Sequence, residues 1–203
     1  MKVLLATNNQ GKAARFKRLL EQADAGIELC TPKELHIDGI DVDETGATLA
    51  ENAERKARAY AGMADMPILA NDIGLYVAGE GFMDAPKRTA LGGVQEHYLT
   101  QEEIARKLLN FWKGIAQKHG GSVDAAWVEA FVAVYPDGSV KRASSRREII
   151  LTDRELGEVP LHLPIRALYY SKATNKPAIQ HTEEEEWLEM QPVIDALIAV
   201  LAK

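Results

Sequence analysis

This sequence of 203 residues has a single cysteine, no excess of basic residues and no long apolar run. The single cysteine, Cys30, cannot form an internal disulfide, and its apolar neighbours IELC favour a buried strand residue over a catalytic thiol. A net charge of −6 argues against a nucleic-acid polymer as ligand, because that binding needs many phosphate-neutralising cations. A nucleotide is not excluded, since a few cations and a metal on carboxylates can hold a small phosphate ligand.

No apolar run approaches the roughly 20 residues that cross a bilayer, and the N-terminus shows no signal-peptide pattern. We therefore expect no membrane partner and a cytoplasmic location. The hydrophobic fraction of 46% and charged fraction of 27% are those of an ordinary globular protein. The length suffices for one sizeable core, or for two small lobes that share a cleft.

Apolar periodicity and turn residues predict a mixed α/β protein whose long hairpin forms a second lobe. The first helix should direct Ala14, Leu19 and Leu20 to the core, and the last should break at Pro192, which suits a helix's first position. The predicted strands are 2–7, 27–30, 66–72, 74–79 (either paired with 66–72 or continuing it), the two arms of a hairpin around 136–138, and 166–170. The predicted helices are 11–24, 48–63, 100–118 and the tail from 182.

The segment TNNQGK (7–12) lies between the first strand and the first helix. It is not a P-loop, which needs an earlier glycine and a hydroxyl after the lysine. A helix N-terminus nevertheless favours anions, Gly11 permits close backbone approach, Lys12 adds a charge, and Asn8 and Asn9 can donate hydrogen bonds. The alternative is a plain strand-to-helix turn with a solvated lysine.

The loop DVDETG (41–46) carries three carboxylates, Asp41, Asp43 and Glu44. Such a cluster is costly unless it is solvated or neutralised by a cation such as Mg²⁺. Both a solvated loop and a metal site therefore stay open.

Asp72 ends the apolar run PILAND. The end of a strand is the usual place for a functional group on an open α/β sheet. There Asp72 could hold a metal or take a proton from an attacking water, or it could be an ordinary turn residue.

In this order and spacing, the segments LATNNQGK, DETGATLAENAERKA and PILANDIGL resemble the inosine triphosphate pyrophosphatase family, over roughly residues 1–90. The resemblance implies a mixed central sheet with flanking helices. It also implies one domain over residues 1–203 with two lobes around a cleft, usually in a homodimer. The implied reaction is attack of water on a nucleoside triphosphate, which yields the monophosphate and pyrophosphate.

Carried over by position, the resemblance places Thr7, Asn8, Asn9 and Lys12 on the triphosphate. Glu44 would bind Mg²⁺, with Mn²⁺ as a possible substitute, and Asp72 would be the general base or a further metal ligand. Lys12 and Asp72 are thus the predicted catalytic residues, since a lysine and a metal can neutralise the leaving diphosphate.

The chain also departs from the family pattern. Arg15 stands where the family has an acidic residue, and Asn71-Asp72-Ile73-Gly74 replaces Asp-Asp-Ser-Gly. The C-terminal Gly-Tyr-Asp-Pro and Ser-His-Arg motifs are missing, so we expect altered base specificity.

Three basic residues that follow the divergent segment could replace the lost phosphate contacts: Arg166, Lys172 and Lys176. The alternatives to the pyrophosphohydrolase are a catalytically weakened nucleotide-binding protein on the same fold, and a hydrolase of another phosphorylated metabolite.

Overall fold

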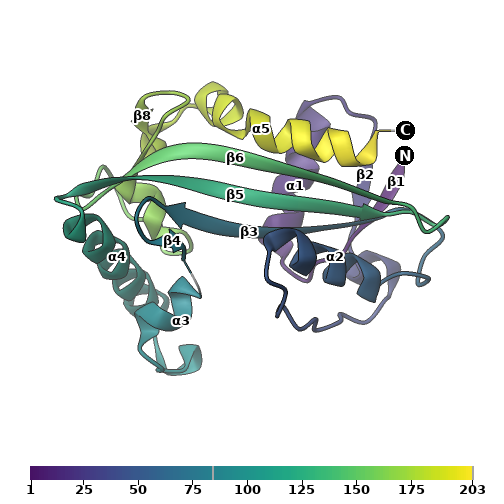
Figure 1. Ribbon diagram of the computed structural model, residues 1–203, viewed down its shortest axis with the longest axis horizontal. Helices are drawn as coiled ribbons and strands as arrows, with labels where there is room; N and C mark the ends of the chain where they lie inside the picture. The colour runs from purple at the N-terminus through teal and green to yellow at the C-terminus, as the bar shows by residue number, and fades with distance from the viewer. Residues whose placement is uncertain (84, 203) are drawn as a thin grey trace. The chain divides into compact units, whose positions relative to one another are not determined.

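The computed structural model describes residues 1–83 and 85–202 as helices around a mixed sheet (Figure 1). The α-helices are α1 (Gln10–Gln22), α2 (Leu49–Ala59), α3 (Pro86–Leu91), α4 (Gln101–Lys118) and α5 (Glu183–Leu201). The strands are β1 (Lys2–Leu5), β2 (Glu28–Cys30), β3 (Ile68–Val77), β4 (Gly81–Phe82), β5 (Ser122–Val134), β6 (Val140–Thr152), β7 (Tyr169–Ser171) and β8 (Lys176–Pro177). Short 3₁₀ turns lie at Lys33–Leu35, Glu96–Tyr98, Pro164–Leu168 and Ala178–Gln180.

The strand order of the sheet is β2-β1-β3-β5-β6-β7-β8, and β4 pairs with β3. β1 runs parallel to β2 and β3, whereas β4 is antiparallel to β3, and β7 is antiparallel to β6 and β8. Figure 1 shows β5 and β6 as two long neighbouring strands. The predicted fold class, a mixed central sheet with flanking helices, is confirmed.

The chain divides into two compact units, and strands β3, β5 and β6 contribute to both. The first unit comprises Met1–Ile73, Val128–Arg146 and Gln191–Lys203, and the second comprises Gly74–Trp127 and Arg147–Met190. Each unit has its own buried apolar cluster. The cleft expected between two lobes stays a prediction.

The first unit buries one face of α1 and one face of α2. On α1 the buried residues are Ala13, Phe16, Leu19 and Leu20, whereas Ala14 is exposed. The prediction for Ala14 was wrong because Phe16, three residues after Ala13 and packed edge-on against Phe131, sets the buried face of this helix. On α2, Ala53 and Ala57 belong to the cluster that also holds strand residues such as Leu4, Ile68 and Val132.

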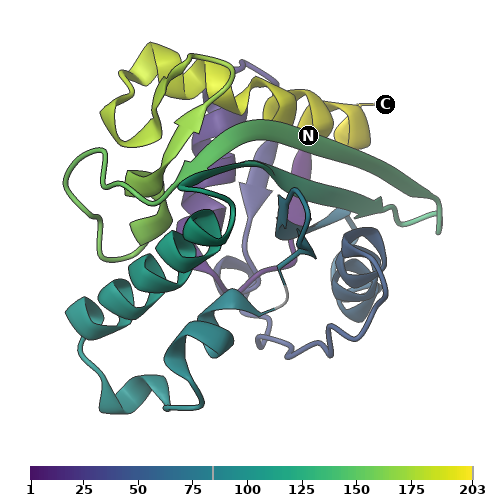
Figure 2. The same cartoon turned by 60° about the vertical axis from the view of Figure 1, so that its left-hand side comes forward.

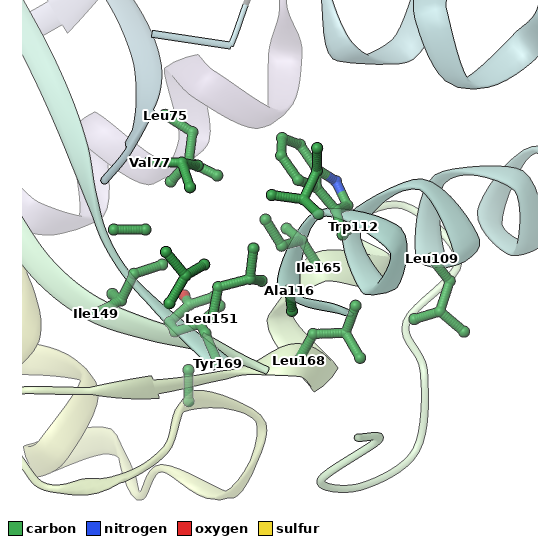
Figure 3. Packing of buried hydrophobic residues seen from close by; sticks show 14 residues of the cluster. Leu75, Val77, Leu109, Trp112, Ala116, Ile149, Leu151, Ile165, Leu168 and Tyr169 are labelled. Carbon is green, nitrogen blue, oxygen red and sulfur yellow. The ribbon is translucent and has the colours of Figure 1, made fainter. Parts of the chain in front are cut away.

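The second unit is built around a cluster that joins α4 to the sheet (Figure 3). Trp112 and Ala116 of α4 belong to it together with Leu75, Leu151 and Leu168. The short helix α3 packs against α4, and the two lie side by side in Figures 1 and 2. This unit also buries an ion pair, Arg147 with Glu189, at 3.1 Å.

Several predicted boundaries differ from the structure. Most of 166–170 is a 3₁₀ turn that precedes β7. Of the two alternatives for 74–79, the structure has the second, since this run continues 66–72 in one strand, β3. Pro192 does not break the tail, because it lies inside the continuous helix α5. The hairpin around Pro136-Asp137-Gly138 is confirmed: Gly138 has φ of 83°, a conformation that favours glycine.

Cys30 is buried in β2, as predicted. Its thiol lies 3.3 Å from the Val3 carbonyl oxygen, and burial raises its pKa, which disfavours the reactive thiolate. Among the residues that the structure describes, no helix is both long and apolar enough to span a bilayer.

Candidate active site

The loop after β1 forms the N-terminal cap of α1. Asn9 is the N-cap, and its Oδ1 accepts a hydrogen bond from the Lys12 amide at 3.0 Å. Thr7 Oγ1 accepts from the Asn9 amide at 3.2 Å, which fixes the cap in turn. The amides of Gln10 and Gly11 lie in the first turn, where no helical partner exists, so this end of α1 offers donors and partial positive charge to an anion.

The acidic loop has no regular secondary structure, but α2 and the residue after it hold it at three points. The Ile40 amide donates to the Tyr60 hydroxyl at 2.9 Å, the Arg55 guanidinium donates to Thr45 Oγ1 at 2.6 Å, and the Gly46 amide donates to Asn52 Oδ1 at 2.7 Å. A side chain at Gly46 would lie 2.6 Å from Asn52 Oδ1, so the approach needs glycine. Glu44 is thereby carried on an anchored loop.

Lys56 of α2 brings the two predicted carboxylates together. Its Nζ lies 2.8 Å from Glu44 Oε2 and 2.9 Å from Asp72 Oδ1, and its side chain is only 15% exposed. Asn52, one helical turn earlier, donates from Nδ2 to Asp72 Oδ2 at 3.3 Å. Glu44 and Asp72 therefore face a common point, as the metal-site prediction requires.

Asp72 lies in the middle of β3 and not at a strand end, so that expectation was wrong. The reason is that β3 outruns its neighbour: the pairing of β1 with β3 includes Leu5 with Leu69, where β1 ends, and β3 continues to Val77. Asp72 thus lies beyond the carboxyl end of β1, beside the loop that leads into α1. The strand whose carboxyl end lies at the candidate site is therefore β1, and not β3.

A cavity of about 280 Å³ in the first unit gathers most of the predicted site. It is lined by Ala6, Thr7, Asn8, Asn9, Lys12, Ile40, Asp41, Val42, Glu44, Lys56, Tyr60 and Asn71. Gly11 and Asp72 are not among these lining residues; Asp72 joins the cavity through its contact with Lys56.

Lys12 is a largely buried cation in a crowded electrostatic environment. Desolvation on burial lowers the pKa of its ammonium most, followed by the charge of Lys56, while Asp72 and Glu129 act in the opposite direction. Its Nζ makes a long hydrogen bond of 3.5 Å to the Asn71 carbonyl oxygen. Because no carboxylate of the described residues forms an ion pair with it, this ammonium is suited to receive an anion.

The donor set fits a hard divalent cation. In proteins Mg²⁺ is usually held by one or two carboxylates, with waters and substrate phosphates completing the shell. Glu44 and Asp72 supply two carboxylates that already converge on one positive charge, that of Lys56. In the described part of the chain, no group of three or more His, Cys, Asp and Glu side chains could hold a metal ion.

Sequence reasoning missed Lys56 and Asn52. Both lie on α2, four residues apart, so they project from one face of the helix, beside the buried face of Ala53 and Ala57. That spacing was readable in the sequence. The pairing with Asp72 was not, because it depends on how α2 packs beside β3.

The three proposed substitutes for the lost phosphate contacts all belong to the second unit. Arg166 lies 3.9 Å from Glu186, Lys172 lies 2.7 Å from Asp124, and Lys176 pairs with Glu185. Their role as a relocated phosphate clamp stays a prediction.

Comparisons with known proteins point to one family. A model of the Ham1 family matches residues 3–149. The chain is 33% identical over 179 residues to the dITP/XTP pyrophosphatase of Aquifex aeolicus (strain VF5), with 81% of each chain covered. It is 42% identical over 192 residues to the dITP/XTP pyrophosphatase of Frankia alni, covering 89% of this chain and 91% of that one.

The fold is also similar to a solved structure. The Staphylococcus aureus Ham1 protein matches with a TM-score of 0.70 and 26% identity, covering 99% of this chain and 98% of that one. The resemblance drawn from the three N-terminal segments is confirmed, and the chain belongs to the Ham1 family.

Proposed function

We propose that this protein hydrolyses a nucleoside triphosphate to the monophosphate and pyrophosphate, with a divalent metal and with altered base specificity. The observation that carries the proposal is the convergence of Glu44 and Asp72 on Lys56, beside a cavity lined by Lys12 and the α1 cap. The names of the Aquifex and Frankia relatives support the reaction class.

The cavity suits the phosphate end of a nucleotide. Pockets that enclose a whole small-molecule ligand are about 300–1,000 Å³, so a volume of about 280 Å³ fits a part of one. The lining groups are amide and ammonium donors from Asn8, Asn9 and Lys12, which match phosphate oxygens. In this proposal they bind and orient the triphosphate.

The chain's own residues supply the proton chemistry. Water attacks phosphorus, the anhydride bond to the leaving pyrophosphate breaks, and Asp72 takes the proton of the water. Lys12 neutralises charge that develops on the leaving group. Glu44 and Asp72 would hold Mg²⁺ or Mn²⁺, which lowers the pKa of bound water and polarises phosphoryl oxygens.

Pyrophosphate release from a panel of nucleoside triphosphates, including dITP and XTP, tests the proposal with and without Mg²⁺ or Mn²⁺. We expect turnover that a chelator abolishes, and a loss of at least about 100-fold in kcat for Asp72→Asn and Glu44→Gln. Glu34→Gln is a matched control, because Glu34 is 50% exposed and pairs with Lys17, whereas Glu44 is 51% exposed and pairs with Lys56. No turnover with any nucleotide would contradict the proposal.

Nucleotide binding without hydrolysis is a second candidate. It is favoured by Asn71, which stands where the family motif has a carboxylate, and by the engagement of Asp72 with both Lys56 and Asn52. Calorimetric binding of a nucleotide with no product would support it. Turnover of another phosphorylated metabolite alone would instead point to a changed substrate.

We also propose one domain over residues 1–203 and a homodimer, both from the family resemblance, and a cytoplasmic location, from the sequence pattern. Light scattering of the purified protein measures the oligomeric state, and a monomer at working concentration would contradict the homodimer.

A further inference from the structure

Glu129 of β5 is a fully buried carboxylate that the proposed reaction does not use. Its side chain is 0% exposed, and a buried charge is costly unless it is paired and hydrogen-bonded. Glu129 Oε2 accepts from Arg15 Nη2 of α1 at 2.5 Å and from Asn71 Nδ2 of β3 at 3.2 Å. One carboxylate oxygen therefore joins a helix to a neighbouring strand next to the site.

Asn71 links this buried carboxylate to the cavity. Its side chain is 3% exposed, and Nδ2 also lies within hydrogen-bonding distance of the carbonyl oxygens of Asp72, at 3.3 Å, and Ala130, at 3.4 Å. Three acceptors therefore fix the orientation of the amide. The backbone carbonyl oxygen of the same residue accepts from Lys12 Nζ at 3.5 Å.

These contacts form a continuous relay from Arg15 through Glu129 and Asn71 to Lys12. Two of its members, Arg15 and Asn71, are positions at which the chain departs from the family motifs. The two differences from the family motifs are structurally linked, because the same Glu129 oxygen accepts from both side chains.

We propose that Glu129 is a positioning residue: it fixes Asn71, and through the Asn71 carbonyl it fixes the Lys12 ammonium that receives the phosphate. The expected effect on catalysis rests on the proposed function. The expected effect on phosphate binding rests only on the chain of contacts from Arg15 to Lys12. Glu129 itself lines no part of the cavity described above.

Replacement of Glu129 by glutamine removes the carboxylate but keeps the size of the side chain. In Glu129→Gln the negative charge is lost. Even with the amide oxygen at the position of Oε2, the side chain accepts more weakly from Asn71 and no longer gives the Arg15 cation its carboxylate partner. Because removing one partner of a buried ion pair is strongly unfavourable, we expect Arg15 and the Asn71 residue that shares its acceptor to shift. Lys12 then loses its fixed position.

Glu189→Gln is the matched control. Glu189 is 1% exposed and pairs with Arg147 at 3.1 Å, so it is also a buried glutamate paired with an arginine, but it lies in the second unit. Both variants should lose stability. Only Glu129→Gln should change phosphate binding.

Two measurements test the proposal: the Kd of inorganic tripolyphosphate with Mg²⁺ by calorimetry, and steady-state kinetics on the best nucleotide. We expect Glu129→Gln to raise both Kd and KM by about tenfold and to lower kcat, and Glu189→Gln to change Kd and KM by less than about two-fold. Destabilisation alone removes active molecules, which lowers apparent kcat but leaves Kd and KM unchanged. An unchanged Kd in folded Glu129→Gln overturns the proposal.

A double-mutant cycle shows whether the effect acts through Lys12. In a Lys12→Ala background, Glu129→Gln should change Kd by less than about two-fold, because the group it positions is gone. A full tenfold effect in that background would contradict the relay.

A second variant guards against misfolding of Glu129→Gln. Arg15→Met with Glu129→Leu replaces the ion pair by apolar side chains of similar size, an exchange that is often neutral for stability. We expect the same rise in Kd, and a wild-type Kd overturns the proposal. If the wild-type protein binds tripolyphosphate but hydrolyses no nucleotide, the proposed function fails while the Kd comparison still decides the role of Glu129.

Discussion

The Lys56 ammonium lies 2.9 Å from the Asp72 carboxylate, and the same ammonium holds Glu44. A cation thus occupies the point on which the two carboxylates converge. Because Lys56 is 15% exposed, its charge is only partly screened by water.

Replacing Lys56 should therefore impair turnover. In Lys56→Gln the two carboxylates lose their shared cation, and among the described residues Asn52 is left to orient the Asp72 carboxylate. We expect kcat/KM for pyrophosphate release to fall by at least about tenfold. Lys113→Gln is the control, since Lys113 is 25% exposed and pairs with Glu155 in the second unit; equal effects in the two variants would contradict a specific role for Lys56.

The charged Lys12 side chain should destabilise the ligand-free folded protein, because burial and the Lys56 charge lower the pKa of its ammonium. Between the lowered pKa and the ordinary value of 10.5, the unfolded chain binds more protons than the folded one, so wild-type stability rises with pH there. Lys12→Met removes the ammonium and with it this destabilisation. We expect a higher Tm than wild type at pH 7, a gap that narrows as the pH approaches 10.5, and weaker tripolyphosphate binding.

The same comparison has a clear failing result. A Tm for Lys12→Met at or below that of the wild type at pH 7 would show that the ammonium is not a net burden on the ligand-free protein. Lys17→Met, on the exposed side of α1, controls for the added apolar side chain.

Asn52→Ala should release the acidic loop. The variant loses the hydrogen bonds to the Gly46 amide and to Asp72, which are worth about 1–3 kcal/mol together in the free energy of unfolding. Urea denaturation measures the loss, and limited proteolysis should cut residues 38–47 faster than in the wild type. Unchanged cleavage would mean that Tyr60 and Arg55 suffice to anchor the loop.

Pro192 should weaken α5. Inside a helix proline removes one backbone hydrogen bond and crowds the carbonyl four residues earlier. We expect Pro192→Ala to raise the free energy of unfolding by about 2 kcal/mol in urea denaturation. A loss of stability would show that the proline is favoured by its local packing.

Local signals in the sequence sufficed for much of this molecule. The hairpin at Pro136 and the strand-turn-helix opening around Lys12 each depend on a few adjacent residues, and the structure has both. Glu44 and Asp72 both contact Lys56, but their role as metal ligands, which came from the family resemblance, stays a prediction.

The rest depends on contacts between distant segments. The partner of Arg15 is 114 residues away, and that of Lys56 on β3 is 16 residues away. No periodicity within α1 or α2 encodes such pairs. Pro192 failed as a helix breaker for the related reason that tertiary packing overrides local propensity.

The charged side chains that line the cavity are two lysines, Lys12 and Lys56, and two carboxylates, Asp41 and Glu44, so their formal charges cancel. A polyanion that enters such a neutral cavity meets no net positive charge there, so it must either displace Glu44 from Lys56 or arrive with counterions of its own. Binding of a polyanion in this cavity is therefore an exchange of ionic partners, and the protein can discriminate between ligands at this binding step, before any bond is broken.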